Sequence, residues 1–133
     1  MSLKVIVVDD DDVVVFLHRK MIEISNFKTE PISFLGGKEA FEFLVNDFKP
    51  GNSYLIFLDI NMPLMNSWEF LELVDHEQFK DSVYVVIVTS SINESDKIKA
   101  KEYQRVIAFL EKPINLEKLK YVKELDVLKD FRL

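Results

Sequence analysis

Apolar residues along this chain follow two alternating patterns. Short continuous runs rich in Val and Ile have the length and composition of strands covered on both faces of a sheet. These runs predict five strands, near residues 4–8, 28–34, 54–58, 83–88 and 106–110. Between the runs, apolar residues recur at the spacing of amphipathic helices. This spacing predicts five helices, near residues 12–25, 37–47, 67–76, 94–104 and 115–130.

The order of these elements predicts the fold. A strand followed by a helix, five times over, is typical of an α/β protein with a doubly wound parallel sheet. Pro31 lies in the second predicted strand, and because proline has no N–H to donate, that strand is expected at an edge of the sheet. The chain has no repeat, low-complexity tract or linker, so a single domain over residues 1–133 is expected.

Helix starts and helix faces are also predicted from residue type. Three asparagines stand at expected N-caps: Asn66, Asn93 and Asn115. Glu69, three residues after Asn66, completes the pattern of a capping box. In the first helix, the expected buried face consists of Val14, Leu17, Met21 and Ile24. His18 and His76 are expected on helix surfaces, because neither has a second metal-ligating residue at a suitable spacing.

Composition narrows the functional class. The chain contains no cysteine, which excludes disulfides and thiolate metal sites and fits a cytoplasmic location. Because strand-like sequence begins within a few residues of Met1, no signal peptide is expected, and no apolar run approaches the roughly 18 residues of a membrane span. The formal net charge of −6 argues against a nucleic-acid partner, because nucleic-acid-binding proteins usually carry a basic face.

Carboxylates gather where two predicted strands end. Asp9 and Asp10 follow the first strand and Asp59 ends the third, whereas Asp11–Asp12 are expected to cap the next helix. Neighbouring strands lie about 4.8 Å apart, so carboxylates at adjacent strand ends can share a cation. Hard oxygen ligands suit Mg²⁺, and the main-chain carbonyl of Asn61 is a further candidate ligand. A carboxylate beside such an ion can attack phosphorus, which makes Asp59 a candidate nucleophile.

Two residues at later strand ends complete the candidate site. Thr89 ends the fourth predicted strand, where its hydroxyl could donate a hydrogen bond to a phosphoryl oxygen. Lys112 ends the fifth and precedes Pro113, and its ammonium is expected to pair with Asp59 and later with a phosphoryl oxygen. Both should face the cleft at the carboxyl edge of the sheet, where ligands of open α/β sheets bind.

An acidic pair after the first strand, Asp after the third, Thr after the fourth and Lys-Pro after the fifth resembles the receiver domain of two-component response regulators. The resemblance covers nearly the whole chain and implies a flavodoxin-like (βα)5 sheet with strand order 2-1-3-4-5. It implies that Asp59 is the phosphoacceptor, with Thr89 and Lys112 acting beside it. The implied Mg²⁺ ligands are Asp9, Asp10, Asp59 and the carbonyl of Asn61. Thr89 and Phe109 become the switch residues.

The same resemblance implies how the chain would act. It would accept a phosphoryl group from a histidine kinase or phosphotransfer protein and signal to a downstream target protein through its 94–130 face. It would be a monomer or weak homodimer without an output domain, catalysing only its own phosphorylation and dephosphorylation. Two departures concern the readout: Asn66-Ser67 stands where the family often has Asp-Gly, and Phe109 lacks the hydroxyl of the more usual Tyr.

Two alternatives of other classes remain open. Residues 8–13 also fit the first motif of haloacid-dehalogenase-type phosphohydrolases, with Asp9 as nucleophile and Asp11 as acid/base. That assignment leaves residues 61–63 unexplained, and the chain lacks the cap insertion and later acidic pair of such enzymes. The second alternative is an interaction module that keeps the receiver fold but works without phosphorylation.

Overall fold

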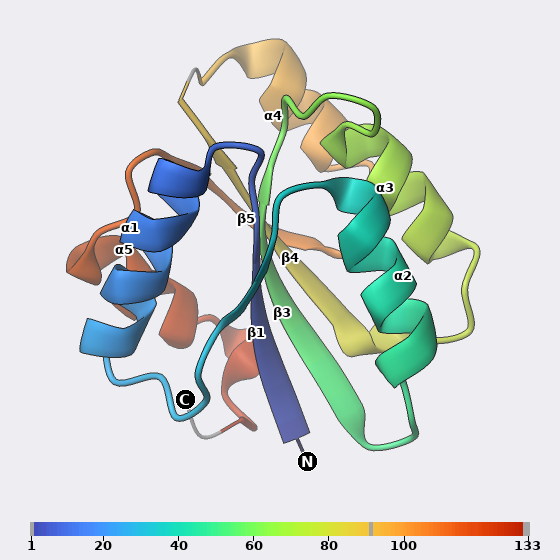
Figure 1. Ribbon diagram of the computed structural model, residues 1–133, viewed down its shortest axis with the longest axis horizontal. Helices are drawn as coiled ribbons and strands as arrows, with labels where there is room; N and C mark the ends of the chain where they lie inside the picture. Colours follow the sequence, from blue (N-terminus) through green and yellow to red (C-terminus); the bar gives the residue numbers. More distant parts are fainter. Residues whose placement is uncertain (1, 91, 132–133) are drawn as a thin grey trace.

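The computed structural model describes residues 2–90 and 92–131. Within these ranges a five-stranded parallel sheet has the order β2-β1-β3-β4-β5, which confirms the predicted α/β fold (Figure 1). The strands are β1 (Ser2–Val8), β2 (Ile32–Phe34), β3 (Asn52–Asp59), β4 (Val83–Thr89) and β5 (Val106–Glu111). The helices are α1 (Asp12–Ile24), α2 (Gly37–Asp47), α3 (Ser67–Asp75), α4 (Glu94–Ala100) and α5 (Leu116–Lys123), with 3-10 helices η1 (Lys80–Ser82) and η2 (Asp126–Leu128). No helix of the described ranges is long and apolar enough to cross a membrane.

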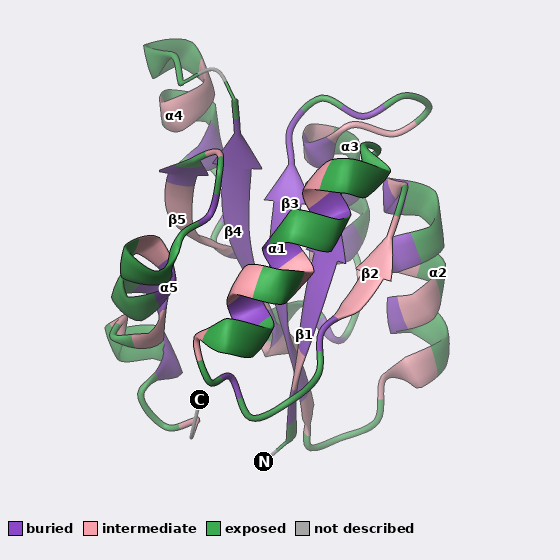
Figure 2. Cartoon of the chain, turned by 60° about the vertical axis from the view of Figure 1, so that its left-hand side comes forward, coloured by how far each residue is buried: buried purple, intermediate pink, exposed green. Residues whose placement is uncertain are grey.

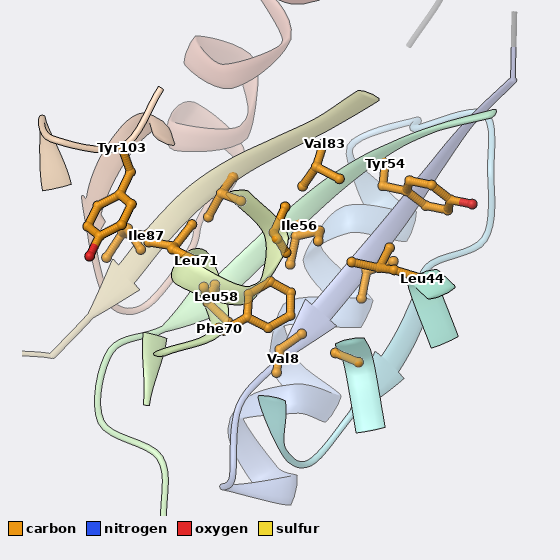
Figure 3. Packing of buried hydrophobic residues seen from close by; sticks show 14 of the residues in the cluster. Val8, Leu44, Tyr54, Ile56, Leu58, Phe70, Leu71, Val83, Ile87 and Tyr103 are labelled. Atoms are coloured by element: carbon orange, nitrogen blue, oxygen red, sulfur yellow. The ribbon is translucent and has the colours of Figure 1, made fainter. Parts of the chain in front are cut away.

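Helices cover both faces of the sheet. α1 and α5 lie on one face, and α2, α3 and α4 lie on the other (Figure 1). β1, β3 and β4 are therefore buried along most of their length, which explains their continuous apolar sequences (Figure 2). Leu44 of α2 and Phe70 and Leu71 of α3 share one buried cluster with Ile56 and Leu58 of β3 (Figure 3). A second cluster fills the space under α1 and α5.

β2 is a short strand at one edge of the sheet. It pairs with β1 from Ile32 onward, whereas the sequence predicted a strand beginning at residue 28. Pro31 immediately precedes the paired residues and has no N–H to contribute to the ladder. The predicted edge position is confirmed, and the predicted length is wrong.

α4 and α5 end earlier than their apolar spacing predicted. α4 ends at Ala100, and the turn after it brings Tyr103 onto α3, where the Tyr103 hydroxyl donates a hydrogen bond to Glu72 at 3.0 Å. α5 ends at Lys123, because Leu125 has a ψ of 136°, outside the helical range. A contact with α3 thus holds the turn that ends α4, although the apolar pattern continues past the ends of both helices.

The buried face of α1 differs from the predicted one. Val15, His18 and Ile22 are buried, whereas Leu17 and Ile24 are 50% and 57% exposed. The first turns of this helix are apolar on every side, so the spacing of apolar residues does not select one face. His18, predicted on the surface, is only 3% exposed and belongs to the interior.

Side-chain caps fix the starts of four helices. The predicted caps are confirmed at Asn66, Asn93 and Asn115. Asn66 and Glu69 form the complete capping box, each side chain accepting a hydrogen bond from the main chain of the other. Asp11 caps α1 by accepting hydrogen bonds from the N–H groups of Val13 and Val14. These caps hold the loops at the carboxyl edge of the sheet.

Candidate functional site

Three carboxylates meet at the carboxyl edge of the two central strands. β1 and β3 pair in register up to Val8 and Leu58, so Asp9 and Asp59 follow at adjacent positions. Asp9, Asp10 and Asp59 each offer an oxygen atom, and these atoms lie within 4.8 Å of one another. Asp9 and Asp59 are 2% and 7% exposed, whereas Asp10 faces solvent. The predicted acidic cluster is present. Because anions that are buried this close together repel one another strongly, they require positive charge nearby.

Lys112 supplies positive charge to this cluster. Its Nζ lies 2.7 Å from Oδ2 of Asp9 and 3.1 Å from Oδ1 of Asp59. The peptide bond between Lys112 and Pro113 is cis. Burial disfavours the charge on Lys112, but its hydrogen bond to Asp9 and the negative charges of Asp59 and Asp9 outweigh burial and raise its pKa. Lys112 therefore stays protonated between the two carboxylates.

Burial also governs the charge of Asp59. Desolvation raises the pKa of this carboxyl to about 6, and the nearby charge of Asp9 adds to the shift. The charge of Lys112 and its hydrogen bond act in the opposite direction but do not cancel these effects. With a pKa about one unit below neutrality, about nine-tenths of Asp59 is ionised at pH 7. Most Asp59 side chains thus carry the negative charge that a nucleophile needs. Because this charge is buried beside Asp9, binding of a cation there would be favourable.

The remaining predicted residues lie on β4, on β5 and in the loop between β3 and α3. Thr89 ends β4, which pairs with β3, and is 2% exposed. Its main-chain carbonyl accepts a hydrogen bond from the N–H of Lys112 at 2.8 Å, so these two residues lie side by side. Asn61 is exposed in the β3–α3 loop. Phe109 lies opposite Ile87 on β5 and packs, partly buried, against the cluster beneath α2 and α3.

The oxygen donors of this edge fit a hard divalent cation such as Mg²⁺. Asp10 and Asp59 offer carboxylates, and the carbonyl of Asn61 lies in the loop that follows Asp59. Both oxygens of Asp9 are already engaged, because Oδ1 accepts the N–H of Asp11 at 2.9 Å and Oδ2 contacts Lys112. A contribution of Asp9 through water is therefore more compatible with these contacts than direct coordination.

The departure at Asn66-Ser67 does not strain the loop. Ser67, which stands at the glycine position of the pair, is the first residue of α3 and has no positive φ, so this position does not need the conformational freedom of glycine. Ser67 is fully buried, and its N–H donates to the carbonyl of Ile60 at 3.1 Å, which closes the β3–α3 loop. The left-handed conformation in this loop occurs instead at Leu64, with a φ of 70°.

Sequence reasoning missed one residue near the site. His18 is buried in α1, and its Nε2 accepts a hydrogen bond from the N–H of Ile114, two residues after Lys112. The available signal was the i, i+3, i+7 spacing of Val15, His18 and Ile22, which marks a second helix face. The apolar residues at positions 14, 17, 21 and 24 have the same helical spacing, so the sequence alone favoured that face and placed His18 on the surface.

Comparison with known proteins points to a single family. A model of the response regulator receiver domain matches residues 5–123. Two-component response regulator 24 of Arabidopsis thaliana is 29% identical over 120 residues, which make up 89% of this chain and 79% of that protein. Hybrid signal transduction histidine kinase G of Dictyostelium discoideum is 30% identical over 122 residues, which make up 91% of this chain and 3% of the kinase. The crystal structure of a two-component response regulator from Cytophaga hutchinsonii superposes with a TM-score of 0.80 and is 30% identical in sequence. The match covers 91% of this chain and 93% of that structure's chain.

Proposed function

This chain belongs to the receiver-domain family of two-component response regulators, and on that premise we propose that Asp59 accepts a phosphoryl group from a histidine kinase or phosphotransfer protein. The observation that supports this assignment best is the placement of the Lys112 ammonium between Asp9 and Asp59, beside a third carboxylate from Asp10. A buried carboxylate with an adjacent fixed cation is suited to attack phosphorus and to hold the resulting anion.

The chain's own residues would divide the transfer between them. Oδ2 of Asp59 would attack phosphorus while the bond from phosphorus to the donor breaks and its electron pair leaves with the donor. Lys112, already on Oδ1 of Asp59, would hold a phosphoryl oxygen of the product. Asp10, Asp59 and the carbonyl of Asn61 would hold Mg²⁺, which supplies positive charge to the phosphoryl oxygens when bound.

A change at Thr89 would carry the signal outward. We expect its hydroxyl to turn towards the new phosphoryl group and Phe109 to repack in response. Phe109 lines a groove of about 240 Å³ between α4 and β5, together with Lys97 and Ala100. Repacking there would shift the 94–130 face between two populations and alter its affinity for a downstream protein.

The phosphohydrolase alternative has no support in the folded protein. Asp11, its required acid/base, is engaged as the N-cap of α1. Asp9, its required nucleophile, is held by Lys112 and by the N–H of Asp11. The match to receiver domains over residues 5–123 points the same way. The alternative of an interaction module without phosphorylation is left to experiment.

The test is the intact mass of the protein after incubation with acetyl phosphate, with and without Mg²⁺. One added phosphoryl group that requires both Mg²⁺ and Asp59 is expected. Asp59→Asn should remove the adduct, and Asp12→Asn, the same substitution at an exposed neighbouring acid, should keep it. An adduct that survives in Asp59→Asn would place the phosphoacceptor elsewhere. No adduct in the wild type, together with no Mg²⁺-dependent change in Trp68 fluorescence on adding beryllium fluoride, would favour the interaction module.

A further inference from the structure

His18 is a buried titratable residue to which the proposed phosphotransfer assigns no role. It is 3% exposed and lies on the inner face of α1 between Val15 and Ile22. A polar ring in this position needs a hydrogen-bond partner, because a buried polar group without one is destabilising. The identity of that partner connects α1 with the candidate site.

The partner is the loop that carries Lys112. Nε2 of His18 accepts a hydrogen bond from the N–H of Ile114 at 3.4 Å, across 96 positions of sequence. Ile114 is itself 2% exposed and belongs to the cluster beneath α1 and α5. The main-chain N–H of Lys112 itself donates a hydrogen bond to the carbonyl of Thr89 at the end of β4. The segment 112–114 is thus attached to β4 at one end and to α1 at the other.

The chemistry of the ring suits this contact. An imidazolium donates from both nitrogens and accepts from neither, so Nε2 can receive the Ile114 N–H only in the neutral ring, with the proton on Nδ1. Burial lowers the pKa of His18 to about 4, against the opposing charge of Asp9, and the charge of Lys112 lowers it further. The ring is therefore neutral at physiological pH and acts as a permanent acceptor.

We infer that His18 is a positioning residue for phosphotransfer: by holding the main chain of Ile114, it keeps the Lys112 ammonium between Asp9 and Asp59. This inference rests on the proposed function of Asp59. The ammonium contacts both carboxylates within 3.1 Å, and a small displacement of the 112–114 segment would weaken both contacts. His18 would not touch the phosphoryl group; it would act through Lys112.

Two substitutions separate the hydrogen bond from packing. His18→Leu puts an apolar side chain of similar size in place of the ring and leaves the Ile114 N–H without its acceptor, whereas His18→Gln keeps a side-chain acceptor. His76→Leu, at the exposed histidine that follows α3 as its C-cap, is the matched control. Rates of phosphoryl uptake from acetyl phosphate and of its loss are measured by intact mass, and folding is checked by circular dichroism.

We expect His18→Leu to slow phosphoryl uptake roughly fivefold, the factor that corresponds to about 1 kcal/mol for one net hydrogen bond. His18→Gln and His76→Leu should stay within about twofold of the wild type. Folded His18→Leu with wild-type uptake would overturn the inference, and so would His18→Gln as slow as His18→Leu, since packing alone would then explain the effect.

A second measurement distinguishes failure of this inference from failure of the proposed function. If the wild type takes up no phosphoryl group and beryllium fluoride with Mg²⁺ leaves Trp68 fluorescence unchanged, the proposed function of Asp59 fails, and the link from His18 to Lys112 is still measurable by urea unfolding. A double-mutant cycle with His18→Leu and Lys112→Met should give a combined loss of stability smaller than the sum of the single losses. Additive losses would show that His18 does not hold Lys112 and would overturn the inference.

Discussion

Replacing Asp59 by asparagine should make the protein more stable at neutral pH in the absence of Mg²⁺. The Asp59 carboxyl is 7% exposed and is charged beside Asp9, so its ionised form is unfavourable in the folded state. Asparagine has nearly the same shape and carries no charge. The side chain proposed for phosphotransfer is thus expected to destabilise the fold that presents it.

The magnitude follows from the pKa of Asp59. Folding raises it from 3.8 to about 6, so between these pH values the folded state binds more protons than the unfolded state. The contribution of Asp59 to the free energy of unfolding is therefore fully present below pH 3.8 and is lost as the pH rises through 6. The difference of about 2.2 pKa units corresponds to about 3 kcal/mol at pH 7. With roughly 2.1 cal/mol/K of unfolding entropy per residue, that is a rise in Tm of roughly 10 °C for 133 residues.

The assay is urea unfolding of wild type and Asp59→Asn at pH 7 and pH 4, with a chelator and at low salt. Asp130→Asn, an exposed position with the same change in net charge, is the control. The free energy of unfolding of Asp59→Asn should exceed that of the wild type by a large amount at pH 7 and by little at pH 4. Mg²⁺ should reduce this difference, because it should stabilise the wild type more. The pKa of His18 is about 4, so its protonation contributes to the stability of every protein compared at pH 4, and the result rests on the difference between Asp59→Asn and Asp130→Asn. A gain no larger than that of Asp130→Asn, or one that is unchanged at pH 4, would refute this account of Asp59.

Three further predictions concern single contacts. Lys112→Met leaves two buried carboxylates without their cation, so the free energy of unfolding at pH 7 should fall by about 3 kcal/mol in urea titrations, and by clearly less at pH 4; an equal loss at both pH values would contradict the charge argument. Asn66→Ala removes the capping box with Glu69 and should lower stability by about 1 kcal/mol, whereas serine at position 66 should restore most of it. Tyr103→Phe removes the hydrogen bond to Glu72 and should lower the unfolding free energy by about 1 kcal/mol while leaving phosphoryl uptake from acetyl phosphate unchanged; slower uptake would show that the contact between Tyr103 and α3 also affects the site.

The order of the elements and the edge that carries the acids could be predicted from sequence because both depend on local pattern. Continuous apolar runs identify strands buried on both faces, and polar residues directly after them must emerge at the carboxyl edge of a parallel sheet. Asp9, Asp59, Thr89 and Lys112 were therefore correctly expected at one edge. The strand order came from resemblance to a family, because alternation of strands and helices does not specify it.

Tertiary structure alone decided which face of α1 is buried and where α4 ends. Neither property is local: an apolar helix surface can pack on several sides, and a helix stops where contacts with distant residues outweigh its own propensity. Tyr103 leaves the helical path to reach α3, and His18 enters the core to meet Ile114, a residue 96 positions away. The sequence by itself determined which chemical groups this protein has and at which edge they gather. The distances of 2.7 and 3.1 Å that join Lys112 to its two carboxylates exist only once packing has brought the ends of β1, β3 and β5 together, because a charge pair depends on separation and burial and not on sequence order.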